Sequence, residues 1–365
     1  MIYIANPFFG QNEKKYLKET IDTAWISSKG RFIEEFEKQF AKKYGAKYAV
    51  CCSNGTSALH LGLIGCGISE GDEVIVPNFT FISSANVIVH CGAKPVFVDV
   101  EEDTWNIDPK EIEKKITKRT KAIMPVHIYG HPANMIEIKK IADKHKLLIV
   151  EDCAESQGAK VKDKFVGRIG DAGCFSFFGN KIMTTGEGGM CITDSKKAYE
   201  KMCLYRSHGM DAVKKYHHPV VGYNYRMTNM QAAIGVGQLE NVDKFIKRRD
   251  EIKERYEKNL QDLAEKGLVK LMPHKNWATP VCWFYCILVK ASKRDELMKF
   301  LEKNGVDNRP FFPSISKQKA YSSHNSEKYP VSEMLSKSGL NLPTYYELKD
   351  KDIDYVTDQI KSFFK

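Results

Sequence analysis

Short apolar runs alternate with helix-like segments between residues 46 and 205, and this alternation constrains the fold more than any other feature. The run "LLIVED" at residues 147–152 is continuous, apolar and closed by two acids, which is typical of a parallel strand buried on both faces. Similar runs recur at residues 47–53, 72–79, 94–100, 121–130, 172–178 and 188–194. Helical segments separate most of them, so the pattern predicts an α/β fold with a mostly parallel sheet and helices on both faces.

The pattern changes after residue 229. Residues 231–242 and 245–263 are expected to form two long helices, the second with an apolar stripe of Ile252, Tyr256, Leu260 and Leu263. A strand at residues 284–291 and a helix at residues 294–305 follow. We therefore expect a large domain over residues 1–240, which includes an N-terminal arm, and a smaller C-terminal α+β domain over residues 241–365.

Charge and cysteine content limit the classes of function. The net charge of +10 suits an anionic partner, either a phosphorylated small molecule or a nucleic acid. The basic residues are interleaved with acids along helices, and no nucleic-acid-reading motif is present, so we expect no nucleic-acid partner. The ten cysteines are scattered without paired CxxC blocks, and we expect no metal site. Without a signal-like N-terminus or a membrane-length apolar run, a cytoplasmic protein is expected.

Ligands of open parallel sheets bind beyond the carboxyl ends of the strands, so polar residues at those ends are the first candidates. Gly55, Thr56 and Ser57 open the helix after the first strand, where N–H groups and hydroxyls could hold a phosphate. An ordinary capped helix start would have the same sequence. After "LLIV" come the carboxylates Glu151, Asp152 and Glu155; one of them could hold a positively charged ring nitrogen, or could simply cap the next segment.

The stretch "SFFGNKIMTTGEGGM" at residues 176–190 places Lys181 among glycines. A lysine that can lose its proton is an amine nucleophile toward aldehydes. Phe79 and Phe81 follow another strand end and could stack on a flat ring, although either could belong to the core. A phosphate site, an acid for a ring nitrogen, an aromatic face and an amine are together what pyridoxal 5'-phosphate requires.

Several motifs in the same order resemble the DegT-type family of nucleotide-sugar aminotransferases. They are "SNGTSALHL", "GDEVIVPNFTFISSANVI", "HIYGHPANM", "VEDCAES", "GDAGCFSFFGNKIMTTGEGGM" and "GYNYRMTNMQAAIG". The resemblance extends from residue 25 to about residue 315 and, within the family, looks most like the GDP-perosamine synthases. It implies the fold type I of pyridoxal-phosphate-dependent aminotransferases and a homodimer with shared active sites.

The resemblance also implies roles for individual residues. Lys181 would bond covalently to the cofactor and later move protons. Asp152 would pair with the ring nitrogen, Glu155 would lie by the ring hydroxyl, and Phe81 would stack on the ring. Asn224 would reach the phosphate from the partner subunit. The remaining phosphate ligands would be Gly55, Thr56, Ser57 and Ser176.

The implied reaction takes an amino group from L-glutamate to C4 of a 4-keto-6-deoxy nucleotide sugar, with GDP-4-keto-6-deoxy-D-mannose as the expected acceptor. Glu155 stands where many relatives carry glutamine, which we expect to tune the ring hydroxyl rather than to change the reaction class. The nucleotide and its pyrophosphate need cations and hydroxyls, although exposed cations commonly bind nothing specific. The candidate substrate-binding residues are Ser27, Ser28, Lys29, Arg226 and Arg309.

Three alternatives remain open at this level. The same chemistry could act on a dTDP- or UDP-linked 4-keto sugar, or on a 3-keto sugar. A sugar dehydratase could use the same cofactor, but such relatives carry histidine where this chain has Lys181. A non-catalytic cofactor-binding protein is disfavoured because Lys181, Asp152 and the glycine-rich loop are all present.

Overall fold

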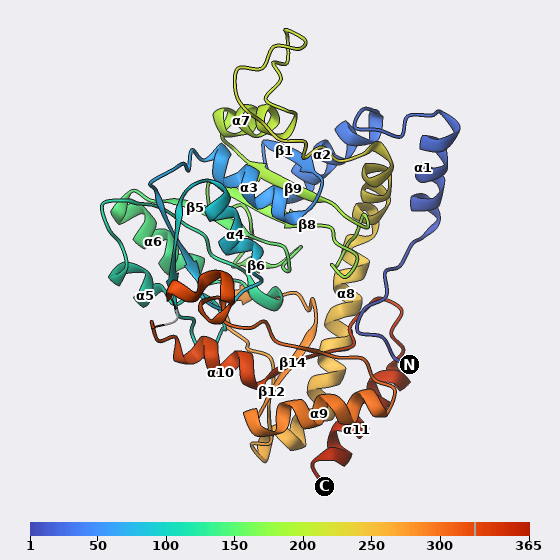
Figure 1. The fold of residues 1–365 in the computed structure, drawn as a ribbon. Helices are drawn as coiled ribbons and strands as arrows, with labels where there is room; N and C mark the ends of the chain where they lie inside the picture. Colours follow the sequence, from blue (N-terminus) through green and yellow to red (C-terminus); the bar gives the residue numbers. More distant parts are fainter. Residues whose placement is uncertain (325) are drawn as a thin grey trace.

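A seven-stranded sheet forms the centre of the computed structural model, which describes residues 1–324 and 326–365 (Figure 1). Its strand order is β1-β9-β8-β5-β4-β2-β3. The neighbours β8, β5, β4, β2 and β3 pair in parallel, whereas β9 pairs antiparallel with both β1 and β8. The strands are β1 (Tyr48–Cys52), β2 (Glu73–Pro77), β3 (Lys94–Val98), β4 (Thr120–Ile123), β5 (Leu148–Asp152), β8 (Ala172–Ser176) and β9 (Gly189–Thr193). The predicted α/β class with a mostly parallel sheet is confirmed.

Two apolar clusters, one on each face of this sheet, explain why its strands are continuously apolar. Side chains alternate along a strand, so Val74 and Val76 of β2 join one cluster while Ile75 joins the other. Helices α3 (Gly55–Gly65), α4 (Ser83–His90) and α7 (Lys196–Arg206) cover the Val74 side. Helices α2 (Arg31–Tyr44), α5 (Pro109–Lys114) and α6 (Met135–His145) cover the Ile75 side. Helices therefore lie on both faces, as the alternation predicted.

Helix α8 (Asn229–Glu265) is one continuous helix of 37 residues, so the prediction of two helices was wrong (Figure 1). Thr228 caps it through a reciprocal pair of hydrogen bonds with Gln231. No proline or glycine interrupts residues 238–265, so nothing ends the helix near residue 243. The N-terminal helix α1 (Gln11–Asp22) packs beside α8. The proposed domain boundary at residues 240/241 falls inside α8 and remains a prediction.

A second, antiparallel sheet follows α8, in the order β10-β12-β14-β13. Its strands are β10 (Val269–Lys270), β12 (Tyr285–Val289), β13 (Arg309–Pro310) and β14 (Gly339–Leu342), with helices α9 (Ala291–Lys303), α10 (Pro330–Ser338) and α11 (Asp350–Phe363). A small third sheet joins β6 (Lys160–Val161), β7 (Lys164–Phe165) and β11 (Ala278–Thr279). Short 3-10 turns are η1 (Ile128–Gly130), η2 (Ile315–Lys317) and η3 (Lys319–His324).

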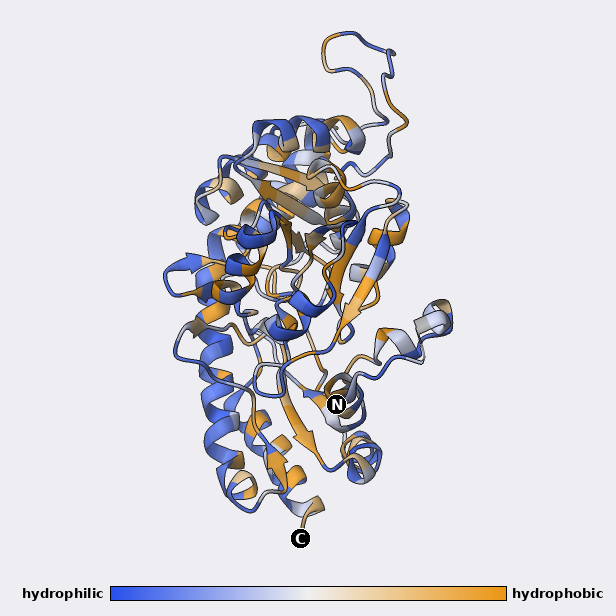
Figure 2. Cartoon of the chain, turned by 90° about the vertical axis from the view of Figure 1, so that its left-hand side faces the viewer, coloured by the Kyte–Doolittle hydropathy of each residue, from blue (hydrophilic) through white to orange (hydrophobic). Residues whose placement is uncertain are grey.

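The distribution of hydrophobic residues matches this layered arrangement. Figure 2 shows predominantly hydrophobic strands inside and predominantly hydrophilic outer helix surfaces. The predicted stripe of α8 is buried, with Ile252, Tyr256, Leu260 and Leu263 all at most 4% exposed. Within the described residues, no helix has both the length and the apolar character needed to cross a membrane.

Candidate active site

A cavity of about 600 Å³ opens beyond the carboxyl ends of β2, β5 and β8. Parallel strands place their carboxyl ends at one edge of a sheet, so residues far apart in the chain meet there. The cavity lining includes eight of the predicted cofactor-binding residues: Gly55, Thr56, Ser57, Phe81, Asp152, Glu155, Ser176 and Lys181. The segments before β12 and after β13 add Trp283 and Phe312. The sequence therefore located most of this lining, but not the two aromatic residues from the later part of the chain.

One end of the cavity is the N-terminus of α3. Asn54 caps this helix, since its side-chain oxygen accepts a hydrogen bond from the Ser57 N–H at 2.8 Å. The Thr56 and Ser83 hydroxyls lie 2.9 Å apart. A Cβ on Gly55 would lie 2.6 Å from the Ser176 Cβ, so only glycine lets the helix start approach the end of β8 this closely. The Thr56 and Ser83 hydroxyls lie together at this helix start, which suits a phosphate.

Lys181 also lines the cavity, and its side chain is 12% exposed. Its Nζ is 3.8 Å from Glu155 Oε1 and 3.7 Å from the centroid of the Trp283 ring. Burial lowers the pKa of Lys181, and the carboxylates of Glu155 and Asp152 act against this shift. Burial also raises the pKa of Glu155 to about 7, against the attraction of Lys181. A lysine with a lowered pKa releases its proton more readily and becomes a better nucleophile.

Asp152, at the end of β5, is buried and holds two hydrogen bonds. The Ser84 hydroxyl donates to Oδ2 at 2.8 Å, and the Ala154 N–H donates to Oδ1 at 3.1 Å. Burial raises the pKa of Asp152, while these two donors lower it. Ser84 is 68 residues away in the chain, so the sequence provided no sign of this contact. A carboxylate fixed in this way suits a cationic ring nitrogen.

The cavity fits pyridoxal phosphate on its own geometry. The N-terminus of α3 offers a site for an anion, Asp152 offers a buried carboxylate and Lys181 offers an amine. All three line the same cavity. Of the two aromatic candidates, Phe81 lines the cavity and is 54% exposed, whereas Phe79 is fully buried in the core. The exposed Phe81 ring therefore provides the flat surface.

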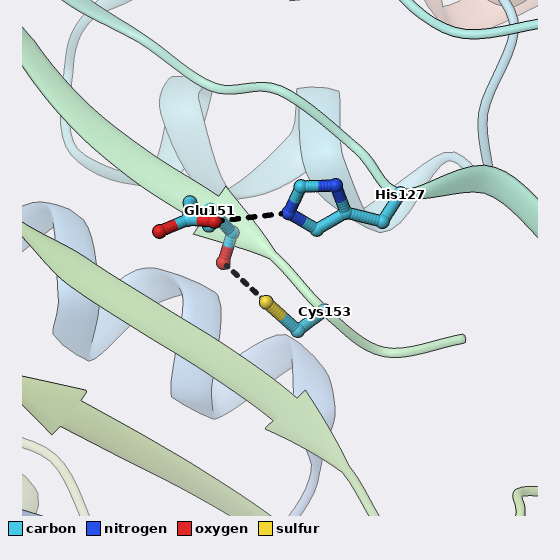
Figure 3. Close-up of side chains that lie close together, drawn as sticks. All are labelled: His127, Glu151 and Cys153. Carbon is cyan, nitrogen blue, oxygen red and sulfur yellow. Dashed lines mark hydrogen bonds and ion pairs between the residues drawn. The ribbon is translucent and has the colours of Figure 1, made fainter. Parts of the chain in front are cut away.

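Behind Asp152, on the other face of β5, lies a buried cluster of His127, Glu151 and Cys153 (Figure 3). The Ala133 N–H donates to His127 Nδ1 at 3.0 Å, so Nε2 carries the proton and donates to Glu151 at 3.1 Å. Three more backbone N–H groups donate to the Glu151 carboxylate, those of Gly167, Ile169 and Gly170. These hydrogen bonds occupy the Glu151 carboxylate and both ring nitrogens of His127. They also hold the loop after β7 close to the end of β5.

The remaining predicted residues do not line this cavity within a single chain. Asn224 is exposed and accepts a hydrogen bond from Arg226 at 3.0 Å. Arg309 is exposed and forms an ion pair with Asp307. The N-terminal candidates lie on the loop between α1 and α2, with Ser27 and Lys29 exposed and Ser28 half-buried. Their roles in substrate binding remain predictions.

The chain matches the model of the DegT/DnrJ/EryC1/StrS aminotransferase family over residues 7–361. It belongs to this family. It is 43% identical over 364 residues to the GDP-perosamine synthase of Escherichia coli O157:H7, covering 100% of this chain and 98% of that protein. It is 46% identical over 359 residues to the GDP-perosamine synthase of Caulobacter vibrioides, covering 97% and 96%.

The fold agrees with solved structures of the same class. The aminotransferase from Psychrobacter cryohalolentis superposes with a TM-score of 0.92 at 31% identity, covering 98% of each chain. The protein is thus a sugar-aminotransferase-type enzyme, and its cofactor is pyridoxal phosphate. This aminotransferase has the fold type I architecture that the motifs implied.

Proposed function

We propose that this enzyme transfers an amino group from L-glutamate to C4 of GDP-4-keto-6-deoxy-D-mannose and so forms GDP-perosamine. The observation that carries the proposal is the similarity to GDP-perosamine synthases along essentially the whole chain. The geometry supports the aminotransferase chemistry, because Lys181, Asp152 and the α3 N-terminus share one cavity. A dTDP- or UDP-linked 4-keto sugar is the alternative acceptor.

Residues of this chain would hold the cofactor at its ring nitrogen, its ring face and its phosphate. Asp152 would accept a hydrogen bond from the ring nitrogen, and Phe81 would pack on the ring. The phosphate would lie among Gly55, Thr56, Ser57 and Ser176 at the α3 N-terminus. When bound, pyridoxal phosphate supplies an electron sink that stabilises negative charge on the carbon next to the transferred nitrogen.

Lys181 is the proton-transfer group of the proposed reaction. Its Nζ removes a proton from the glutamate carbon and later returns one to the sugar carbon, so one amine serves both halves. The lowered pKa of Lys181 brings it closer to neutrality, where an acid–base group works best. Glu155 Oε1, at 3.8 Å, stabilises the ammonium form after each proton is taken up.

The proposed enzyme is a homodimer in which each active site is completed by the partner. The segment between α7 and α8 extends away from the body of the chain (Figure 1). It carries apolar side chains that are 88–94% exposed, namely Val213, Tyr216 and Val221. Such exposure suits a surface that a second copy covers. Asn224 and Arg226 lie at the base of this segment.

An activity panel tests the substrate. Purified, cofactor-loaded protein receives L-glutamate with either GDP-4-keto-6-deoxymannose or dTDP-4-keto-6-deoxyglucose, and the products are weighed by mass spectrometry. Amination of the GDP sugar by the native enzyme, and its loss in Lys181→Ala, is the expected result. Lys160→Ala, which changes a half-buried lysine outside the cavity lining, is the matched control and should remain active. Amination of the dTDP sugar alone would refute the GDP assignment.

Mixing two variants tests the shared site. Lys181→Ala and Asn224→Ala should each be weakly active or inactive alone. If Asn224 acts across the interface, one of the two sites in each mixed dimer contains both native residues. Random subunit exchange makes about half of the dimers mixed, so the mixture should recover up to about a quarter of native activity. Absence of recovery, with dimer exchange shown by mass spectrometry, would contradict the shared site.

A further inference from the structure

Trp283 places an indole ring directly against the amine of Lys181. The residue lies just before β12, is 4% exposed and lines the same cavity. Lys181 Nζ is 3.7 Å from the ring centroid, which is well within the range at which a cation is attracted to an aromatic face. The two residues are about a hundred positions apart, so only the tertiary structure brings them together.

The indole is fixed in place from several directions. Its Nε1–H donates to the Asn180 carbonyl at 2.8 Å, so the ring is tied to the residue that precedes Lys181. The carbonyl oxygen of Trp283 accepts from Arg249. The ring also stacks on Tyr129 at 6.1 Å and 12°, and the Tyr129 N–H holds Glu155 at 2.7 Å. The aromatic face is therefore preorganised and does not need to move to meet the amine.

Other groups near Lys181 act differently from the indole. Glu155 and Asp152 attract the ammonium only when they are ionised, and burial favours their neutral forms. The further titratable residues that line the two cavities around Lys181 are His60, His90, Glu187, Tyr225, Arg249 and Tyr346. An indole face carries no titratable group, so its attraction for a cation is the same at every pH.

We propose that Trp283 is a positioning residue that holds the free, protonated amine of Lys181 against its indole face whenever this lysine is not bonded to the cofactor. The inference rests on the proposed function only in taking Lys181 as the reacting amine, and not on the identity of the sugar. Trp283 thus favours the ammonium form of Lys181 and keeps Nζ beside Glu155 between the two halves of the transfer.

The test measures the titration of Lys181 in the cofactor-free, full-length protein. Acetic anhydride labels free amines, and the labelling rate of the Lys181 peptide is followed by mass spectrometry across pH in the native protein, Trp283→Phe and Trp283→Leu. We expect the midpoint to fall by about one pH unit in Trp283→Leu, a tenfold change equal to about 1.4 kcal/mol. Trp283→Phe keeps a ring but lacks the N–H, and should shift by less than half as much.

Equal shifts in the two variants would show that the tether to Asn180 matters rather than the ring face, and would overturn the proposal. No shift in either variant would also overturn it. Trp277→Phe, which changes a half-buried tryptophan elsewhere, is the matched control.

A fluorescence measurement keeps the proposal testable if Trp283→Leu does not fold. The difference in emission between the native protein and Trp283→Phe should show a transition at the Lys181 midpoint, and Lys181→Met should abolish it. A transition that survives in Lys181→Met would refute the contact. If the activity panel shows no amination of either sugar, the amine-labelling and fluorescence results still stand. The proposed function and the proposed role of Trp283 can therefore be refuted separately.

Discussion

Replacement of Glu155 by glutamine should make the Lys181 amine markedly easier to deprotonate. The two side chains are 5% and 12% exposed and their charged atoms lie 3.8 Å apart. At an effective dielectric constant of about 20, unit charges at this distance attract by about 4 kcal/mol, equivalent to about three pH units. Burial raises the pKa of Glu155 to about 7, so the carboxyl is only partly ionised at neutral pH. We therefore expect the pKa of Lys181 to fall by one to two units, roughly half of that limit.

The direction of the change in the pKa of Lys181 follows from the negative charge of Glu155, which stabilises the ammonium form. Glutamine can still accept the Tyr129 N–H, which donates to Glu155 Oε2 at 2.7 Å, so the local backbone should stay in place. The charged form of Lys181 loses its negative partner, while the neutral amine loses little. The amine should thus be deprotonated at a lower pH in the variant.

The assay is the initial rate at which cofactor-free protein attaches pyridoxal phosphate covalently, followed by absorbance across pH. The half-maximal pH should move downward in Glu155→Gln, and the rate at pH 7 should increase. Glu137→Gln, which removes a partly exposed carboxylate from α6, is the control and should match the native protein. A midpoint that is unchanged or moves upward in Glu155→Gln would refute the electrostatic reasoning.

Three other substitutions have distinct expected outcomes. Asp152→Asn removes the carboxylate proposed for the ring nitrogen and should lower kcat by about 100-fold or more. Gly55→Ala places a Cβ 2.6 Å from the Ser176 Cβ, so it should weaken phosphate binding and lower the free energy of unfolding by about 1–3 kcal/mol. Gly179→Ala, whose Cβ meets no atom within 4 Å, is the control. Equal urea midpoints for the two variants would refute this expectation. Glu151→Gln should cost roughly 3 kcal/mol in urea unfolding, because a fully buried carboxylate that accepts from three backbone N–H groups loses an acceptor oxygen. A loss below about 1 kcal/mol would show that the cluster in Figure 3 does not brace the loop.

The parallel sheet was predictable because burial on both faces demands continuous apolar runs, and β5 shows this most clearly. Most of the cofactor cavity was predictable for a related reason. Residues at or after the ends of β2, β5 and β8 must meet at the carboxyl edge of the sheet, so Asp152 and Lys181 were candidates from the pattern, and the family resemblance favoured Phe81 over Phe79.

Helix boundaries were less predictable. Residues 231–242 and 245–263 were predicted to form two helices, but α8 continues through both. Helix α8 packs against α1 and α2 of the N-terminal part and against β10 and α11 of the C-terminal part, so one continuous helix serves both parts of the chain.

The sequence by itself indicated the fold class, the candidate amine Lys181 and the helix start that we propose for the phosphate, because these depend on local periodicity and on residue types placed at strand ends. Only the tertiary structure decided what surrounds the amine. Glu155 approaches Lys181 from 26 positions away, and Trp283 from about a hundred, and neither distance is encoded in a local pattern. The pKa values of buried groups depend on such neighbours and on the loss of water, which arise only when the whole chain has packed.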